Sequence, residues 1–76
     1  MKLRDKEYKR LTAGANERLD AGESREDVLK WLNYQVKLLE NACIRKKYYN
    51  APDTEEWKDR LEGAEAARED FAGIGL

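Results

Sequence analysis

The fold is decided by residues 24–53, which read SREDVLKWLNYQVKLLENACIRKKYYNAPD. Ser24 opens a capping-box-like Ser-Arg-Glu-Asp signature, and the acidic residues in it favour the start of a helix. Apolar residues then recur at steps of three and four until Pro52, which disfavours helix at the residue before it. We therefore expect a long helix over residues 25–49.

The apolar positions of this stretch are too many for one partner helix. They form two neighbouring stripes, with Val28, Leu29, Leu32, Val36, Leu39 and Cys43 in the first, and Trp31, Leu38, Ala42 and Tyr49 in the second, with Tyr34 at its margin. At about 100° per residue, the two stripes cover more than half of the helix circumference. The pattern predicts that the helix over 25–49 is the middle element of the fold and is packed on both sides.

Shorter helices are expected on either side of this long one. Residues 3–21 place four apolar side chains on one face, and Gly22 supplies the left-handed residue that often ends a helix; the four are Tyr8, Leu11, Ala15 and Leu19. Residues 55–72 carry a similar stripe after Asp53 or Thr54, either of which can cap the helix; this stripe comprises Trp57, Leu61, Ala64 and Phe71.

Together these segments predict an all-α protein. Only two Val, two Ile and two Thr occur in 76 residues, so strands are not expected. Two short turns favour antiparallel neighbours. We expect residues 1–76 to form one domain, an antiparallel three-helix bundle with a long central helix.

Three positions conflict with a simple bundle. Gly14 and Gly63 lie inside expected helices, where glycine costs about 1 kcal/mol relative to alanine. They either let another chain approach closely or are tolerated as poor helix formers. Arg68 falls within an apolar stripe, level with Gln35. Either the two form a buried polar layer, which would require a carboxylate partner such as Glu7, or Arg68 reaches the surface.

The residue types argue against catalysis. The chain contains no histidine, which removes the commonest general base and the commonest metal ligand. Its one serine, Ser24, is explained by helix capping, and its one cysteine, Cys43, continues an apolar stripe. No glycine-rich nucleotide loop is present. We expect no catalytic residues, no metal site and no cofactor.

Charge is distributed in blocks, although the net charge is only −1. Residues 1–10 and 31–50 each carry three excess positive charges, and residues 51–76 carry five excess negative ones. One interpretation is that the blocks face one another when the helices pack. The other is nucleic-acid or nucleotide binding by the basic end of the bundle, with two sets of residues brought together there: Arg45, Lys47 and Tyr48 at the end of the long helix, and Lys2, Arg4 and Lys6 at the start of the chain.

The favoured hypothesis is a non-catalytic protein-binding module. Surplus apolar surface on the long helix predicts a homodimer, with Trp31, Tyr34 and Leu38 as the hydrophobic contacts. The acidic last helix predicts electrostatic contacts with a basic partner, through Glu55, Glu56, Asp59 and Glu62. A small helical protein of this kind is typical of phage or mobile-element inhibitors and adaptors that occlude a surface of a larger host complex.

The sequence predicts neither export nor membrane insertion. No stretch approaches the roughly 20 apolar residues of a membrane span, and the charged start Met1-Lys2-Leu3-Arg4-Asp5 is followed by no signal-peptide core. The single cysteine suits a reducing compartment. We expect a cytoplasmic protein.

Overall fold

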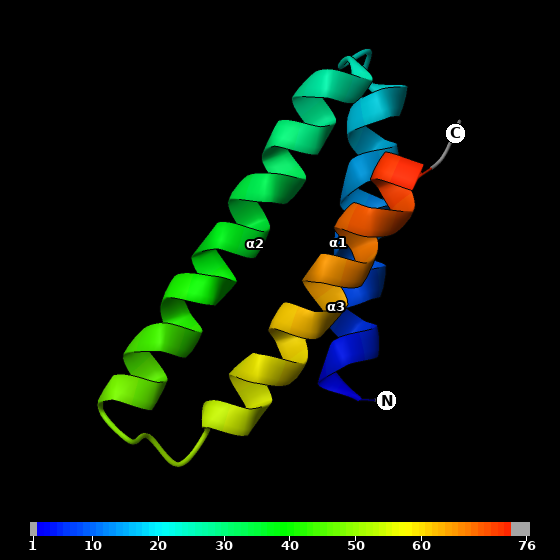
Figure 1. Cartoon of the computed structure of the whole chain (residues 1–76). Coiled ribbons are helices and arrows are strands. Elements are labelled where there is room, and N and C mark those ends of the chain that lie inside the picture. The colour runs from blue at the N-terminus through cyan, green and yellow to red at the C-terminus, as the bar shows by residue number, and fades with distance from the viewer. Residues whose placement is uncertain (1, 74–76) are drawn as a thin grey trace.

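A computed structural model describes residues 2–73 and consists of three α-helices: α1 (Leu3–Asp20), α2 (Arg25–Tyr48) and α3 (Thr54–Gly73) (Figure 1). No strand occurs in this part of the chain. Successive helices run in opposite directions, so α1 and α3 run parallel (Figure 1). The all-α three-helix architecture is confirmed, and each helix begins and ends within one residue of its expected position.

Local signals account for the α1–α2 turn. Gly22 adopts φ 96°, a left-handed conformation that costs glycine little, and the chain reverses there. The Ser24 hydroxyl then accepts a hydrogen bond from the Asp27 amide at 3.1 Å. This bond satisfies one of the free amides of the first helical turn, so α2 starts where the capping signature predicts.

The α2–α3 turn is closed by side chains from both helices. Asn50 takes a left-handed φ of 54°, which asparagine tolerates better than most residues. The Asp53 carboxylate accepts hydrogen bonds from Lys46 Nζ and from Trp57 Nε1, both at 3.1 Å on the same oxygen. These two bonds tie the last turn of α2 to the first turn of α3. Thr54, the other candidate for capping α3, donates its hydroxyl proton to the Ala51 carbonyl at 2.7 Å.

The helix that contacts both others most extensively is α3. Both α1 and α2 pack mainly against α3, and they contact each other least. The expectation that the helix over 25–49 would be the middle element, covered on both sides, was therefore wrong. The physical reason lies in side-chain size: α3 buries Gly63, Ala64 and Ala67, and small residues let a neighbouring backbone come close.

The two helix-interior glycines serve packing within the chain. A Cβ on Gly63 would lie 2.2 Å from the Arg4 carbonyl oxygen, and one on Gly14 would lie 2.6 Å from Trp31 Cη2. Neither distance is compatible with a real side chain. These glycines therefore account for close α1–α3 and α1–α2 contacts, rather than for approach of another chain.

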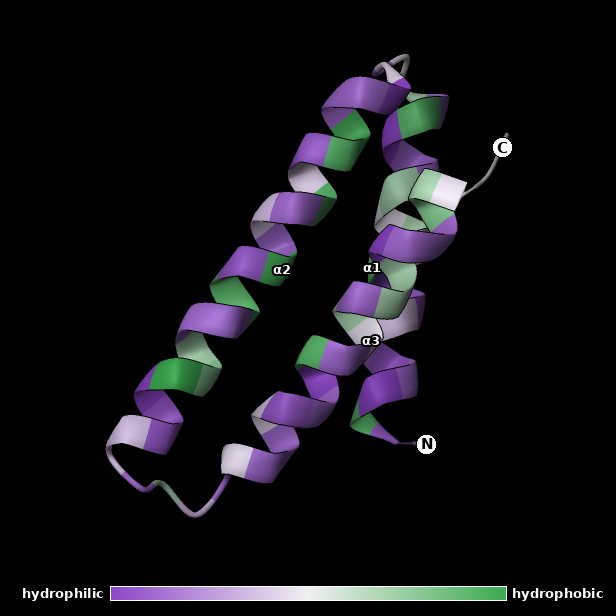
Figure 2. Cartoon of the chain, viewed as in Figure 1, coloured by the Kyte–Doolittle hydropathy of each residue, from purple (hydrophilic) through white to green (hydrophobic). Residues whose placement is uncertain are grey.

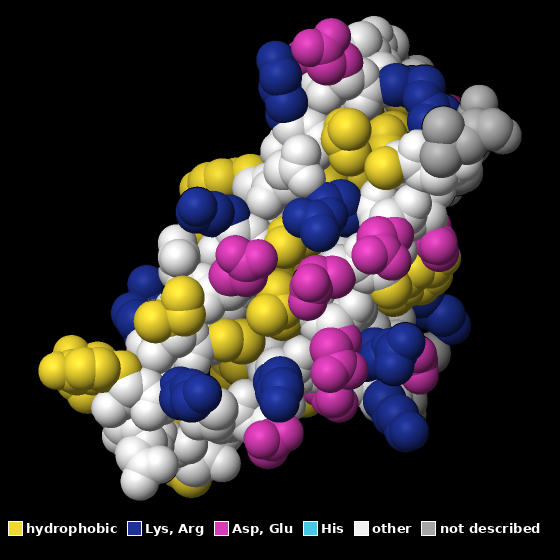
Figure 3. Space-filling view, viewed as in Figure 1, with side chains coloured by type: hydrophobic (Ala, Val, Ile, Leu, Met, Phe, Trp, Pro, Cys, Tyr) yellow, Lys and Arg dark blue, Asp and Glu magenta, His cyan; other side chains and the backbone are white. Residues whose placement is uncertain are grey.

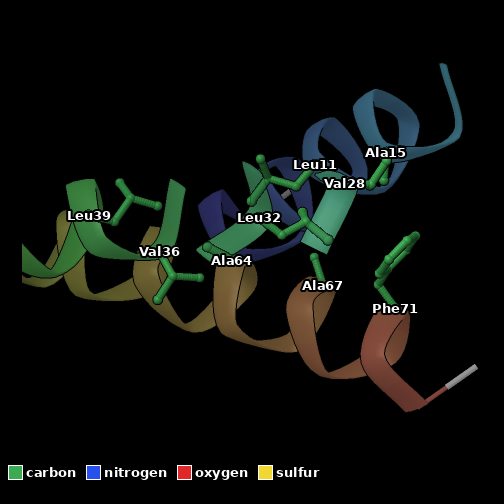
Figure 4. Packing of buried hydrophobic residues seen from close by; sticks show 9 residues of the cluster. All are labelled: Leu11, Ala15, Val28, Leu32, Val36, Leu39, Ala64, Ala67 and Phe71. Atoms are coloured by element: carbon green, nitrogen blue, oxygen red, sulfur yellow. The ribbon is translucent and has the colours of Figure 1, made fainter. Parts of the chain in front are cut away.

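The hydrophobic core lies where all three helices meet, toward the α1–α2 turn (Figure 4). Its nine buried members are Leu11, Ala15, Val28, Leu32, Val36, Leu39, Ala64, Ala67 and Phe71. Figure 2 shows hydrophobic positions of α2 facing the other helices and hydrophilic positions facing outward. After Leu39, α2 contributes no buried residue, so its last turns extend beyond the core.

No polar or charged residue is fully buried in the described part of the chain. Arg68 and Gln35 are both half-buried, so they form no buried polar layer there. Glu7 forms an ion pair with Arg10, one turn away on α1, and is not a partner of Arg68. The interpretation that the Arg68 side chain reaches solvent agrees with this arrangement.

No helix among residues 2–73 combines the length and apolar character needed to cross a membrane.

Gly63→Ala tests the close approach of α1 and α3. Forcing a carbon into a filled contact costs on the order of 1–3 kcal/mol, while alanine regains about 1 kcal/mol of helix propensity. Because the opposing atom is backbone, we expect a net loss of about 1–2 kcal/mol in the free energy of unfolding, measured by urea denaturation. Gly73→Ala is the matched control, since no atom lies within 4 Å of its added Cβ, and it should be neutral or stabilising. Equal stabilities of the two variants would contradict the packing account.

Asp53→Asn tests the two hydrogen bonds that the Asp53 carboxylate accepts at the α2–α3 turn, from Lys46 and Trp57. The hydrogen bond from Lys46, and secondarily that from Trp57, lower the pKa of the Asp53 carboxyl below its ordinary value of 3.8. The charged form therefore stabilises the folded state above about pH 4, and this stabilisation is lost as the pH falls through the lowered pKa of the folded state. We expect the native chain to melt at a higher temperature than the variant at neutral pH, with the two converging toward about pH 2. A difference that stays constant across this range would contradict the assignment.

Candidate functional site

The large apolar side chains that remain exposed are all contributed by α2 and its last residues. Among the described residues they are Tyr34, Leu38, Ile44, Tyr48 and Tyr49. Tyr34 is 58% exposed and Leu38 is 44% exposed, although both lie in the middle of a long helix. Figure 3 shows hydrophobic side chains protruding at the α2 edge of the molecule, away from α3. Such a concentration on one element marks a candidate contact surface.

These side chains belong to a continuous line along the outside of α2. We define the outer stripe of α2 by seven exposed residues spaced three or four apart: Asp27, Lys30, Tyr34, Leu38, Asn41, Arg45 and Tyr48. At about 100° per residue this line lies opposite the face that carries Val28, Leu32, Val36 and Leu39 into the core. The outer stripe therefore points away from both α1 and α3.

Trp31 does not share this environment with Tyr34 and Leu38. Its indole is half-buried, lies against Gly14 of α1, and has the Arg18 guanidinium 4.3 Å from its ring centre. Arg18 in turn forms an ion pair with Glu23 at 3.3 Å. Trp31 thus stabilises the α1–α2 junction, whereas Tyr34 and Leu38 face solvent.

The α3 carboxylates that we expected to contact a basic partner lie on more than one side of the helix. Asp59 and Glu62 line a hollow together with Lys2, Arg4 and Asp5 of the α1 end, and Arg4 lies 4.0 Å from the Glu62 carboxylate. Glu55 instead lines a hollow between α2 and α3, beside Lys47 and Lys58. Glu56 is exposed. Figure 3 shows acidic side chains gathered over α3, with basic ones beside them.

The two basic islands lie at the same end of the bundle but on separate helices (Figure 1). Lys2 and Arg4 lie against α3 carboxylates, and the end of α2 lies apart from the start of α1 (Figure 1). Both islands are at one end, as antiparallel packing predicts, but α1 packs mainly on α3 rather than on α2, so the two islands are not adjacent. This arrangement agrees with the alternative, that oppositely charged blocks face one another.

The basic end of α2 nevertheless presents exposed aromatic rings. Tyr48 is 80% exposed and Tyr49 is 74% exposed, and their rings meet edge to face with centres 5.0 Å apart. Arg45 and Lys47 are exposed beside them, whereas Lys46 is half-buried and bonded to Asp53. The sequence placed Tyr49 in an apolar stripe of the long helix and Tyr48 among the nucleic-acid candidates, and the structure leaves both rings exposed.

The hollow between α1 and α3 is small. Tyr8, Thr12, Asn16 and Asp70 line a space of about 120 Å³ between α1 and α3, well below the roughly 300 Å³ of a small-molecule site. The Tyr8 hydroxyl donates a hydrogen bond to the Asp70 carboxylate, and this bond raises the pKa of Tyr8. Tyr8 and Asp70 therefore serve to join α1 and α3.

Cys43 is half-buried at the α2–α3 contact. Partial burial, and secondarily the nearby Glu40 and Glu65 carboxylates, raise the pKa of its thiol. A thiol of raised pKa is a poor nucleophile at neutral pH. Among residues 2–73, no three acidic or cysteine side chains are grouped so that they could hold a metal ion.

Comparison with protein-family models, curated proteins and solved structures finds no match to this chain.

Proposed function

We propose that this protein is a non-catalytic protein-binding module that uses the outer stripe of α2 as its main contact surface. The observation that carries the proposal is the position of Tyr34 and Leu38, which are 58% and 44% exposed in the middle of a helix whose other side forms the core. Single exposed apolar residues are common on monomers, but an aligned group containing tyrosine is typical of interfaces. A homodimer or a complex with a larger protein would cover this surface.

The acidic side of α3 supplies the second part of the proposal. Glu55 and Glu56 are exposed in the first turn of α3, and Glu62 is half-exposed with only a long contact to Arg4. Carboxylates in this arrangement complement a basic surface and accelerate association with it. The module would then act in the cytoplasm as an inhibitor or adaptor of phage or mobile-element type that occludes a basic surface of a host complex.

A second candidate function is nucleic-acid binding by the last turn of α2. It is favoured by the exposed Tyr48 and Tyr49 rings beside Arg45 and Lys47, because bases stack on such rings and cations contact phosphates. The contribution expected from Lys2, Arg4 and Lys6 is weaker, since Lys2 and Arg4 lie beside carboxylates of α3. Protein binding is therefore the preferred function.

The two functions are separated by a tagged pull-down from host lysate, performed with and without nuclease. The protein-binding proposal expects a discrete protein band that survives nuclease and is lost with Tyr34→Ala or Leu38→Ala. Tyr34→Ala should keep the native melting temperature, because its side chain is 58% exposed, and Leu38→Ala, whose side chain is 44% exposed, should lower it only slightly. Retention of nucleic acid that falls steeply with salt, with protein bands that vanish after nuclease, would instead support the second candidate.

Two controls decide whether the pull-down reports on the outer stripe. Tyr49→Ala removes a ring that is even more exposed than that of Tyr34, directly after α2 and outside the stripe, and should retain the protein band. Trp31→Ala should lower the free energy of unfolding by about 2 kcal/mol, because a half-buried indole is lost from the α1–α2 junction. If Tyr34→Ala binds as well as Tyr49→Ala, the outer stripe is not the contact surface.

A further inference from the structure

Charge changes sign along the outer stripe of α2. The stripe begins with Asp27 in the first helical turn and carries Arg45 in the last turn, with Tyr34 and Leu38 between them. All four side chains are exposed, and neither Asp27 nor Arg45 forms an ion pair with another described residue. Asp27 and Lys30 stand at one end of the stripe, Tyr34 and Leu38 in the middle, and Arg45 near the other end. The Lys30 ammonium lies 3.9 Å from the Glu26 carboxylate, so it is Asp27 that offers a charge for contact at the first end.

We propose that the outer stripe of α2 binds the outer stripe of a second copy of this chain, with the two helices antiparallel and a two-fold axis level with Val36. This inference rests on the proposed function and names the occupant of its contact surface. Residues whose numbers add to 72 then face each other across the axis. Tyr34 lies against Leu38 of the second copy, and Asp27 lies against Arg45 of the second copy.

Position and charge support the same register. Residue 36 is the midpoint of positions 34 and 38 and also of positions 27 and 45, so one axis satisfies the apolar and the ionic pairs together. A two-fold interface repeats each pair, which gives two Tyr–Leu contacts flanked by two Asp–Arg pairs. Spacings of three and four residues are also those by which paired helices interdigitate. A parallel pair would place Asp27 on Asp27 and Arg45 on Arg45, and like charges oppose that arrangement.

The dimer is expected to be weak and reversible. The paired part of the stripe runs from Asp27 to Arg45, 18 residue steps or about 27 Å of helix, so the interface falls in the small class typical of transient complexes. Lys37 is exposed close to the axis in both copies, and repulsion between the two reduces the affinity. A Kd in the micromolar range or above is expected for an interface of this kind. Because α3 packs on the opposite side of α2, its exposed carboxylates stay free in the dimer.

Charge reversal tests this register. We expect Asp27→Arg and Arg45→Asp each to raise the dimer Kd about tenfold, since each change turns both ionic pairs into repulsions. The double variant Asp27→Arg/Arg45→Asp should recover the native Kd, because it restores both pairs with the charges exchanged. Sedimentation equilibrium of the full chain at several protein concentrations measures the Kd, and circular dichroism checks that each variant stays helical. Glu40→Arg reverses an exposed charge of α2 outside the stripe and should leave the Kd unchanged.

The possible results separate this inference from the proposed function. Loss of dimer in both single variants with recovery in the double variant supports the antiparallel pair. A chain that stays monomeric, or a dimer indifferent to the reversals, overturns it. If that happens while Tyr34→Ala still abolishes nuclease-resistant protein capture, the outer stripe binds a different protein, and the proposed function stands without the second copy.

Discussion

The close approach of the α1 backbone to Gly63 is the contact on which the rest of the structure depends. α1 can lie here only because residue 63 has no side chain, since a Cβ would come within 2.2 Å of the Arg4 carbonyl oxygen. Ala64 and Ala67 continue the small, buried surface along α3. α1 packs on this surface of α3. The hydrogen bonds that Asp53 accepts from Lys46 and Trp57 hold the end of α2 to the start of α3. α3 therefore becomes the helix that both others share.

This arrangement leaves one side of α2 without a partner among residues 2–73. Val28, Leu32, Val36 and Leu39 enter the core, while Tyr34 and Leu38 face solvent along the opposite side. The same packing brings Lys2 and Arg4 to Asp59 and Glu62, where opposite charges partly neutralise each other. Near the end of α2, Arg45 is exposed and forms no ion pair with another described residue, and two tyrosine rings are exposed beside it. One packing preference thus decides which apolar and which basic residues are free to bind something else.

Helix positions could be predicted from the sequence because their signals act over a few residues. Gly22, Ser24 and Pro52 each determine a turn or cap within their own neighbourhood, and the structure places helix ends beside all three. The choice of the shared helix could not be predicted in the same way, because it depends on Gly63, and the sequence does not show which backbone lies against that residue. The sequence also grouped Trp31 with Tyr34 and Leu38, because residue type shows only that all three are apolar. Tertiary packing separates them, since the Trp31 indole lies against Gly14 of α1. The split of α3 carboxylates between Arg4 and solvent likewise depends on where α1 lies.

The most direct measurement of this account is a set of proton–proton nuclear Overhauser effects in a dilute, isotope-labelled sample. The account predicts cross-peaks between the Gly63 α-protons and Arg4, and between the Gly14 α-protons and the Trp31 indole. It also predicts that the Tyr34 ring and the Leu38 methyl groups show no cross-peaks to α1 or α3. Cross-peaks from Tyr34 or Leu38 to α1, with none between Gly63 and Arg4, would mean that α1 packs on α2 instead, and would contradict both the shared role of α3 and the free outer stripe.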